Sequence, residues 1–237
     1  MRKIIINASN IHRGGGAVLM REIISCLPKN IDIFILHDKR FVITTEKSLN
    51  IKYKSVRSNL FSRLAIEYWL FKKVKKNDIV LFLGNLPPIF KLKSFVFVFL
   101  QNRFLIDVYA SSKYLNFYSK IRILYERIIL SFFKDNADEF IVQSQSMQQL
   151  LEIYLKKKSI KLPFKKKFLK EIGNKPRNTN NNDFIYVASQ EKHKNHINLL
   201  KAWFLLAEED IFPSLTFTLN KRHFESLLHG FDFNKNI

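Results

Sequence analysis

Three consecutive glycines, Gly14 to Gly16, lie between the short apolar run 4–6 and the amphipathic stretch 18–27. Because glycine has no side chain, the backbone there can take a positive φ, and a polar ligand can approach the amide groups closely. The pattern therefore predicts a site for a polar group between a strand and a helix. The alternative is a glycine-rich turn that serves only packing.

Polar residues also follow two apolar runs further along the chain. The runs 78–83 and 94–100 are short and rich in β-branched and aromatic residues, which predicts buried strands. The residues at the ends of these runs and of the run 4–6 are Asn7, Gly84, Asn85, Gln101, Asn102 and Arg103. In open parallel sheets, ligands bind in the crevice beyond the carboxyl ends of the strands. We therefore expect these residues and the three glycines to converge on one cleft.

The order of elements predicts an α/β fold. Strand, glycine stretch, helix and strand form a βαβ unit up to residue 37, which favours a parallel, Rossmann-like sheet. Further strands are expected at 51–56, 139–143 and 160–163, and helices at 60–76, 120–134 and 146–155. Ser144 is the expected N-cap of the last of these helices.

A change of composition divides the chain. The segment 164–183 has few apolar residues and four asparagines between Asn178 and Asn182, which is typical of a flexible connector. We therefore expect an N-terminal domain at 1–163, a linker at 164–183 and a second domain at 184–237. The second domain has expected strands at 184–188 and 214–219 and helices at 197–207 and 223–228, which is little material for an α/β domain. We expect it to be incomplete.

The net charge of +20 would attract polyanions such as nucleic acid, an anionic lipid leaflet or a nucleoside diphosphate. The richness in Lys, Ile, Asn and Phe is also what an AT-rich coding sequence produces, so base composition is an alternative source of the charge. Cys26 is the single cysteine, which excludes a disulfide framework and favours a reducing compartment. The N-terminus lacks the apolar core of a signal peptide, and the apolar runs are far shorter than the ~18 residues of a spanning helix. We expect a cytoplasmic protein.

The segment 104–134 is dense in aromatic and basic residues. Its helical part is either a core helix with a solvated basic edge or a helix that lies on a membrane surface. The first interpretation is preferred on the sequence alone.

Four stretches, taken in order, resemble the GT-B glycosyltransferases of the retaining nucleotide-sugar family four. They are INASNIHRGGGAVLMREI, LFLGNLPP with FVFVFLQNRFLID, FIVQSQSMQQLL and FIYVASQEKHKNHINLLKAW. The resemblance implies a GT-B-like fold, with a Rossmann-like acceptor-side domain followed by a nucleotide-sugar-binding domain. It also implies transfer of a sugar from a nucleotide diphosphate sugar to a hydroxyl in surface polysaccharide assembly.

The resemblance also implies roles for particular residues. Lys194 matches the family's loop lysine and would contact the donor diphosphate, although a lysine in such a loop is otherwise simply solvated. Gly14, Gly15, Gly16 and Arg13 would face the donor phosphate, and Asn7, Gly84, Asn85 and Arg103 would line the acceptor side. Gln101 and Asn102 stand where many members carry a catalytic histidine; amides orient hydroxyls but do not act as bases near neutral pH. No metal or cofactor is implied, and His193 and His196 lack the further ligands of a metal site.

The family's pair of donor-binding glutamates has no match here, so the expected donor site is incomplete. The chain is then inactive alone, completed by a second chain, or a non-catalytic remnant. The expected partners are a nucleotide sugar, a polyprenyl-linked glycan acceptor and the anionic inner face of the cell membrane. The rival interpretation is a basic nucleic-acid-binding protein, although the sequence shows no known signature of that class.

Overall fold

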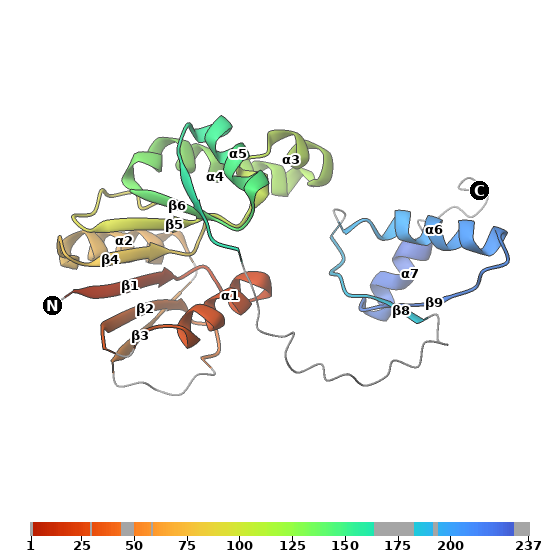
Figure 1. Cartoon of the computed structure of the whole chain (residues 1–237), viewed down its shortest axis with the longest axis horizontal. Coiled ribbons are helices and arrows are strands. Elements are labelled where there is room, and N and C mark those ends of the chain that lie inside the picture. Colours follow the sequence, from red (N-terminus) through yellow and green to blue (C-terminus); the bar gives the residue numbers. More distant parts are fainter. Residues whose placement is uncertain are drawn as a thin grey trace. The chain divides into compact units, whose positions relative to one another are not determined.

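The structure of the chain, a computed structural model, describes residues 2–28, 30–43, 50–57, 59–163, 183–191 and 194–229. The chain forms two compact units, residues 1–165 and 166–237 (Figure 1). The expected linker at 164–183 lies outside the described residues except for Asp183.

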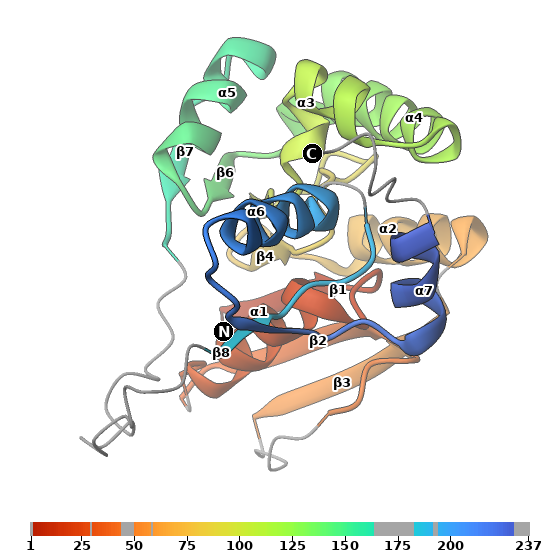
Figure 2. The same ribbon diagram turned by 90° about the vertical axis from the view of Figure 1, so that its right-hand side faces the viewer.

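The first unit is built on a seven-stranded sheet in which every neighbouring pair of strands is parallel (Figures 1 and 2). The strands are β1 (Lys3–Ala8), β2 (Asp32–Asp38), β3 (Ile51–Val56), β4 (Ile79–Phe82), β5 (Phe95–Phe99), β6 (Glu139–Val142) and β7 (Ser159–Lys161). Their order is β3-β2-β1-β4-β5-β6-β7. This is the doubly wound order of a Rossmann-like sheet, so the predicted fold class is confirmed.

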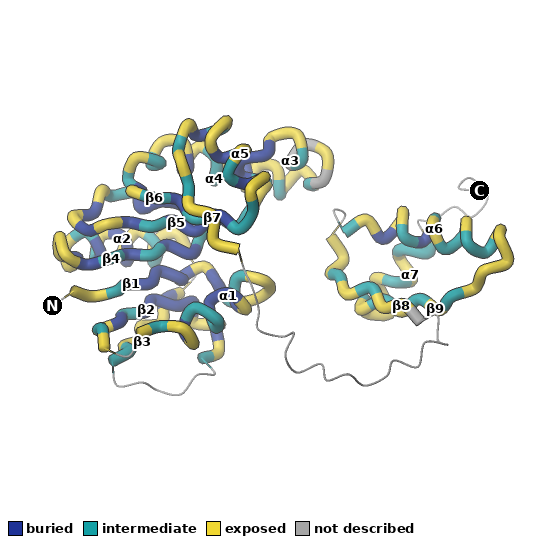
Figure 3. Tube along the Cα trace, in the orientation of Figure 1, coloured by how far each residue is buried: buried dark blue, intermediate teal, exposed yellow. Residues whose placement is uncertain are grey.

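Five helices connect these strands: α1 (Gly14–Ser25), α2 (Leu60–Lys73), α3 (Val108–Tyr114), α4 (Phe117–Phe133) and α5 (Gln145–Leu155). Apolar side chains alternate along the strands and form two cores. Ile5 belongs to the core that includes Leu70 of α2 and Leu130 of α4, whereas Ile6 belongs to the core that includes Met20 of α1. Figure 3 shows the burial concentrated along the central strands of this sheet, whereas the edge strands β3 and β7 are mostly exposed or intermediate.

Several helix boundaries differ from the expectation; α2, for example, ends at Lys73 and not at residue 76. The structure places the three glycines in the first turn of α1, and Gly14 alone of them has a positive φ, of 65°. Glycine is tolerated there because the first N–H groups of a helix have no partner within the helix. The helix expected at 120–134 begins earlier, at Phe117, because the Asn116 side chain accepts a hydrogen bond from the Ser119 N–H at 2.9 Å.

The second unit has a parallel pair of strands, β8 (Asp183–Tyr186) and β9 (Ser214–Phe217), with α6 (His196–Glu208) and α7 (Lys221–His229), all visible in Figure 1. His196 is buried in this unit, where its ring lies 5.3 Å from that of Tyr186, and burial lowers the pKa of its imidazole. It is therefore a core residue. His193, its expected neighbour in the loop, lies outside the described residues.

Candidate ligand site at the carboxyl ends of the strands

The strand order reverses direction between β1 and β4. The chain runs outward from β1 to β3, and α2 then returns it to β4 on the other side of β1. The loops that follow β1 and β4 therefore leave the sheet toward opposite sides, which opens a crevice at the carboxyl ends of the strands. This point is where such sheets bind ligands.

A cavity of about 290 Å³ lies at this point. Its lining comes from the loops after β1, β4 and β5 and from the first turn of α1: Asn10, Ile11, His12, Arg13, Gly16, Leu83, Asn85, Gln101 and Asn102. Five of these, namely Arg13, Gly16, Asn85, Gln101 and Asn102, are site residues expected from the sequence. Asn10 and His12 are not, and they lie between the strand-end residue Asn7 and the glycines.

Asn85 joins two of the loops. Its side-chain oxygen accepts hydrogen bonds from the backbone N–H groups of Gln101, at 2.7 Å, and Asn102, at 3.0 Å. Its φ of 68° is left-handed, a conformation that Asn adopts more readily than most residues. The Asn102 side chain in turn accepts from the Phe104 N–H at 3.1 Å. Gln101 and Asn102 are thus held by backbone contacts, and the amide of Gln101 is left to face the cavity.

The amino end of α1 presents open backbone. Its N-cap, Arg13, makes no side-chain capping bond, and the first turn contains no acidic residue. A Cβ added at Gly14 or Gly15 would meet no atom within 4 Å, whereas one at Gly16 would lie 3.4 Å from Ile11 and 3.8 Å from the Gln101 oxygen. Because free amides and the helix dipole favour negative charge, this turn and the Arg13 guanidinium suit an anionic group.

His12 is backed by a buried carboxylate. Its Nδ1 lies 3.9 Å from Asp38 Oδ2, and the Asp38 side chain is only 1% exposed. The Arg40 guanidinium donates two hydrogen bonds to Asp38, from Nε at 2.9 Å and from Nη2 at 2.7 Å, and the Arg40 backbone N–H donates a third at 2.8 Å. These bonds are the main reason why the pKa of the Asp38 carboxyl lies below its ordinary value. Asp38 is therefore ionised, and its charge lies beside an imidazole that lines the cavity.

A smaller cavity of about 20 Å³, with room for roughly one water, adjoins this one through Asn10. Its polar lining consists of Asn7, Ser9, Asn10, Arg63 and Glu67, and the rest of the wall is Phe82, Gly84 and Leu86. Glu67 is 2% exposed; it accepts from Arg63 Nε at 2.8 Å and from the Ile89 N–H at 2.6 Å. Asn7 and Gly84, two site residues expected from the sequence, thus line this smaller cavity together with Arg63 and Glu67, which are one turn apart on α2.

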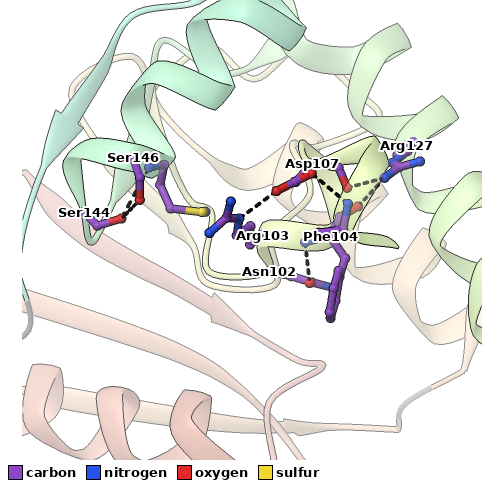
Figure 4. Close-up of polar contacts among 9 residues, drawn as sticks. Asn102, Arg103, Phe104, Asp107, Arg127, Ser144 and Ser146 are labelled. Carbon is purple, nitrogen blue, oxygen red and sulfur yellow. Dashed lines mark hydrogen bonds and ion pairs between the residues drawn. The ribbon is translucent and has the colours of Figure 1, made fainter. Parts of the chain in front are cut away.

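Arg103 lies apart from both linings. Its Nε donates to Asp107 Oδ2 at 2.8 Å, and Figure 4 shows it between Asp107 and the serines Ser144 and Ser146. The Ala110 N–H and, after it, Arg103 hold the pKa of the Asp107 carboxyl below its ordinary value. Ser144 is the N-cap of α5, as predicted, and accepts from the Met147 N–H at 3.3 Å.

Lys194 belongs to the second unit, where its N–H donates to the Glu191 carbonyl at 2.8 Å and its carbonyl accepts from the Tyr186 hydroxyl. Its expected role on a donor diphosphate stays a prediction. Among the residues that the structure describes, no three His, Cys, Asp or Glu side chains lie close enough to share a metal ion. Within the same residues, no helix combines the length and apolarity needed to cross a bilayer.

No protein-family model and no curated protein matches the chain. A similar solved structure is "lipopolysaccharide outer core galactosyltransferase WaaB apo form", with 14% sequence identity and a TM-score of 0.47. The match covers 97% of this chain and 71% of that one. At this identity and TM-score, no argument about activity rests on the likeness.

Proposed function

We propose that the chain is a glycosyltransferase that moves a sugar from a nucleotide diphosphate sugar to a hydroxyl of a glycan acceptor. The observation that carries the proposal is the cavity at the reversal of strand order, with the uncapped turn of α1 and Arg13 on its wall. The sequence resemblance to retaining GT-B enzymes supports the same reaction class. Retention of configuration, and a donor half completed by another chain, stay predictions.

In the proposed reaction, the bond between the anomeric carbon and the diphosphate oxygen breaks, and its electron pair leaves with the nucleoside diphosphate. A bond forms between that carbon and the acceptor hydroxyl oxygen, which gives up its proton. The α1 amides and the Arg13 guanidinium stabilise the charge that grows on the diphosphate. The amides of Gln101 and Asn102 orient the sugar hydroxyls, since they donate and accept hydrogen bonds but do not take up protons.

We assign the proton transfer to His12. Its imidazole lines the cavity, and its Nδ1 lies 3.9 Å from the Asp38 carboxylate, which stabilises the positive charge that the ring gains when it takes up the proton of the acceptor hydroxyl. His12→Gln should lower the rate of nucleoside diphosphate release by about a hundredfold. His229→Ala, in the second unit, is the matched control. A His12→Gln rate equal to that of the control would contradict the assignment.

For the acceptor, we propose a glycan on a polyprenyl diphosphate carrier, held at an anionic membrane by α4. One side of α4 is buried through Ile123, Ile129 and Leu130, which fits the core-helix interpretation. The other side leaves seven large side chains exposed: Phe117, Tyr118, Ile121, Leu124, Tyr125, Ile128 and Phe132. Exposed Lys120 and Arg122 lie on the same helix. Aromatic side chains with lysine and arginine suit the boundary of an anionic leaflet.

Co-sedimentation with vesicles of anionic or neutral lipid tests this acceptor side. The double variant Phe117→Ser and Phe132→Ser removes two side chains that are 71% and 79% exposed. It should lose most of the binding to anionic vesicles. Phe61→Ser on α2, where the side chain is 83% exposed, is the control and should bind as the wild type does. Equal binding of the wild type to neutral vesicles would count against the membrane proposal.

Calorimetric titration with UDP, GDP and their sugars tests the donor side. Arg13→Ala should weaken binding by about tenfold, since it removes one charge-assisted contact. Arg2→Ala, an exposed arginine at the amino end of the sheet, makes the same change of net charge and should have no effect. Tight, strongly salt-dependent retention of DNA together with no nucleotide binding would favour the nucleic-acid alternative instead.

A further inference from the structure

A second cavity, of about 590 Å³, lies at the amino ends of the strands. This is the opposite edge of the sheet from the proposed reaction site, because parallel strands share their direction. One wall is the sheet itself. Lys3 pairs with Asp32, and two residues further along Ile5, Phe34 and Lys52 form a row across β1, β2 and β3. Because side chains alternate along a strand, both rows point to the same face.

The other wall is the carboxyl end of α2. Trp69 and Lys73 lie one turn apart on this helix, and Val74 and Lys75 follow directly. The rings of Trp69 and Phe34 are 5.3 Å apart, so an aromatic surface joins the two walls. Together with Ile5 and Val74, these rings give the cavity an apolar floor.

Charged groups surround this floor. Four lysines line the cavity, Lys3, Lys52, Lys73 and Lys75, and among the residues that the structure describes none of their ammonium groups is in an ion pair. The negative groups are Asp32, Asp78 and the end of the α2 dipole. Both carboxylate oxygens of Asp78 accept backbone hydrogen bonds, from the Lys3 N–H at 3.1 Å and the Lys75 N–H at 2.9 Å. The balance around the cavity is positive.

We propose that this cavity binds a small amphipathic organic anion, with its apolar body on the Phe34 and Trp69 rings and its anionic group toward Lys52 and Lys73. The volume falls within the range of roughly 300–1,000 Å³ of small-molecule sites, which also combine an apolar lining with a few charged groups. An inorganic anion would leave the apolar floor uncovered, and a neutral apolar molecule would leave the lysines without partners. The proposal stands on its own observations and does not depend on the proposed transferase activity.

The probe is 8-anilinonaphthalene-1-sulfonate, an aromatic anion whose fluorescence rises in apolar surroundings. We expect saturable binding to the Trp203→Phe variant of the full chain, with energy transfer from Trp69. The uncharged analogue N-phenyl-1-naphthylamine and inorganic sulfate should both bind more weakly. Lys52→Gln with Lys73→Gln should weaken binding by about tenfold, whereas replacing both by arginine should preserve it.

Lys72→Gln with Lys76→Gln is the matched control, since it removes the same amount of charge at the carboxyl end of α2 without changing a residue that lines the cavity. Its affinity for the probe should equal that of the parent variant, and UDP should not displace the probe. Absence of saturable probe binding would overturn the proposal. So would an equal loss of probe affinity in the Lys52→Gln, Lys73→Gln variant and in the control.

Discussion

The carboxyl and amino ends of the same parallel strands both hold a cavity, and the two are built from different groups. At the carboxyl ends, the proposed anion-binding groups are the open amides of α1 with Arg13, and Asn85 fixes the adjoining loops. At the amino ends, Asp78 already binds the backbone amides of two of the four lining lysines, which leaves lysine side chains around an apolar floor. Fixed amides suit a ligand whose charge must be placed accurately, whereas flexible lysines suit an anion of less defined shape.

A buried carboxylate accepts hydrogen bonds at each end of the sheet: Glu67 at the carboxyl ends of the strands and Asp78 at the amino ends. Removing the two carboxylates should lower the free energy of unfolding by unequal amounts. Glu67→Ala should lower the free energy of unfolding by about 3 kcal/mol or more, because it leaves Arg63, whose side chain is 17% exposed, without its partner. Asp78→Ala removes only an acceptor of two backbone bonds and should cost about 1–3 kcal/mol. Urea unfolding followed by circular dichroism measures both. A larger loss for Asp78→Ala would reverse the comparison.

Asn85 tests how the carboxyl-end loops are held. Asn85→Gly keeps the left-handed backbone but removes the acceptor of the Gln101 and Asn102 N–H groups, so we expect a loss of about 1–2 kcal/mol. These two amides should also exchange faster with deuterium. Asn85→Asp, which keeps an acceptor oxygen, is the control. Unchanged exchange in Asn85→Gly would mean that these bonds do not fix the loop.

Gly14 and Gly15 separate backbone strain from ligand access. Gly14→Ala should destabilise the protein by about 1 kcal/mol because its φ of 65° is left-handed. Gly15→Ala should leave stability unchanged or slightly higher, since alanine favours the helix and its Cβ meets no atom within 4 Å. If the α1 amides bind phosphate, Gly15→Ala should nonetheless weaken nucleotide binding. Thermal unfolding and calorimetry distinguish the two effects, and unchanged nucleotide affinity would place the ligand elsewhere.

The smallest effect is the pH dependence that Asp38 contributes. Its pKa is lower in the folded than in the unfolded chain, chiefly because of Arg40, so it stabilises the fold at neutral pH. That stability should be lost as the pH falls below the unfolded value of about 3.8 and through the folded pKa. Urea midpoints of the wild type should therefore fall more steeply in acid than those of Asp38→Asn. If the urea midpoints of the wild type and of Asp38→Asn fell equally with pH, Asp38 would not be the source of this acid dependence.

The strands, and the order in which strands and helices follow one another along the chain, were predictable because apolar, β-branched runs alternate with amphipathic stretches. Ser144 was predictable as a cap from its place before such a stretch. The start of α1 was not predictable, because glycine is a poor helix former. Only the structure shows Gly15 and Gly16 in helical conformation. α3 has too short an apolar pattern to be predicted.

The residues at the strand ends that form the candidate site were predictable from the sequence, but the side chains that they contact were not. His12 and Asp38 are far apart in sequence, and they meet because β1 and β2 pair in parallel with Ala8 opposite His37. The ion pair between Arg63 and Glu67 has a local signal in the sequence, because the two residues are four positions apart on α2. The amino-end cavity depends on the register that aligns Ile5, Phe34 and Lys52, which composition and periodicity do not specify.

Hydrogen–deuterium exchange with and without nucleotide diphosphate sugars tests most directly which end of the sheet binds the donor. We expect added protection in peptides that cover residues 9–16 and 100–103, which include Arg13, Gln101 and Asn102. Peptides that cover residues 50–54 and 69–78, at the amino-end cavity, should be unchanged. Protection confined to the amino end, or no protection in either set at saturating nucleotide sugar, would contradict the proposed transferase site.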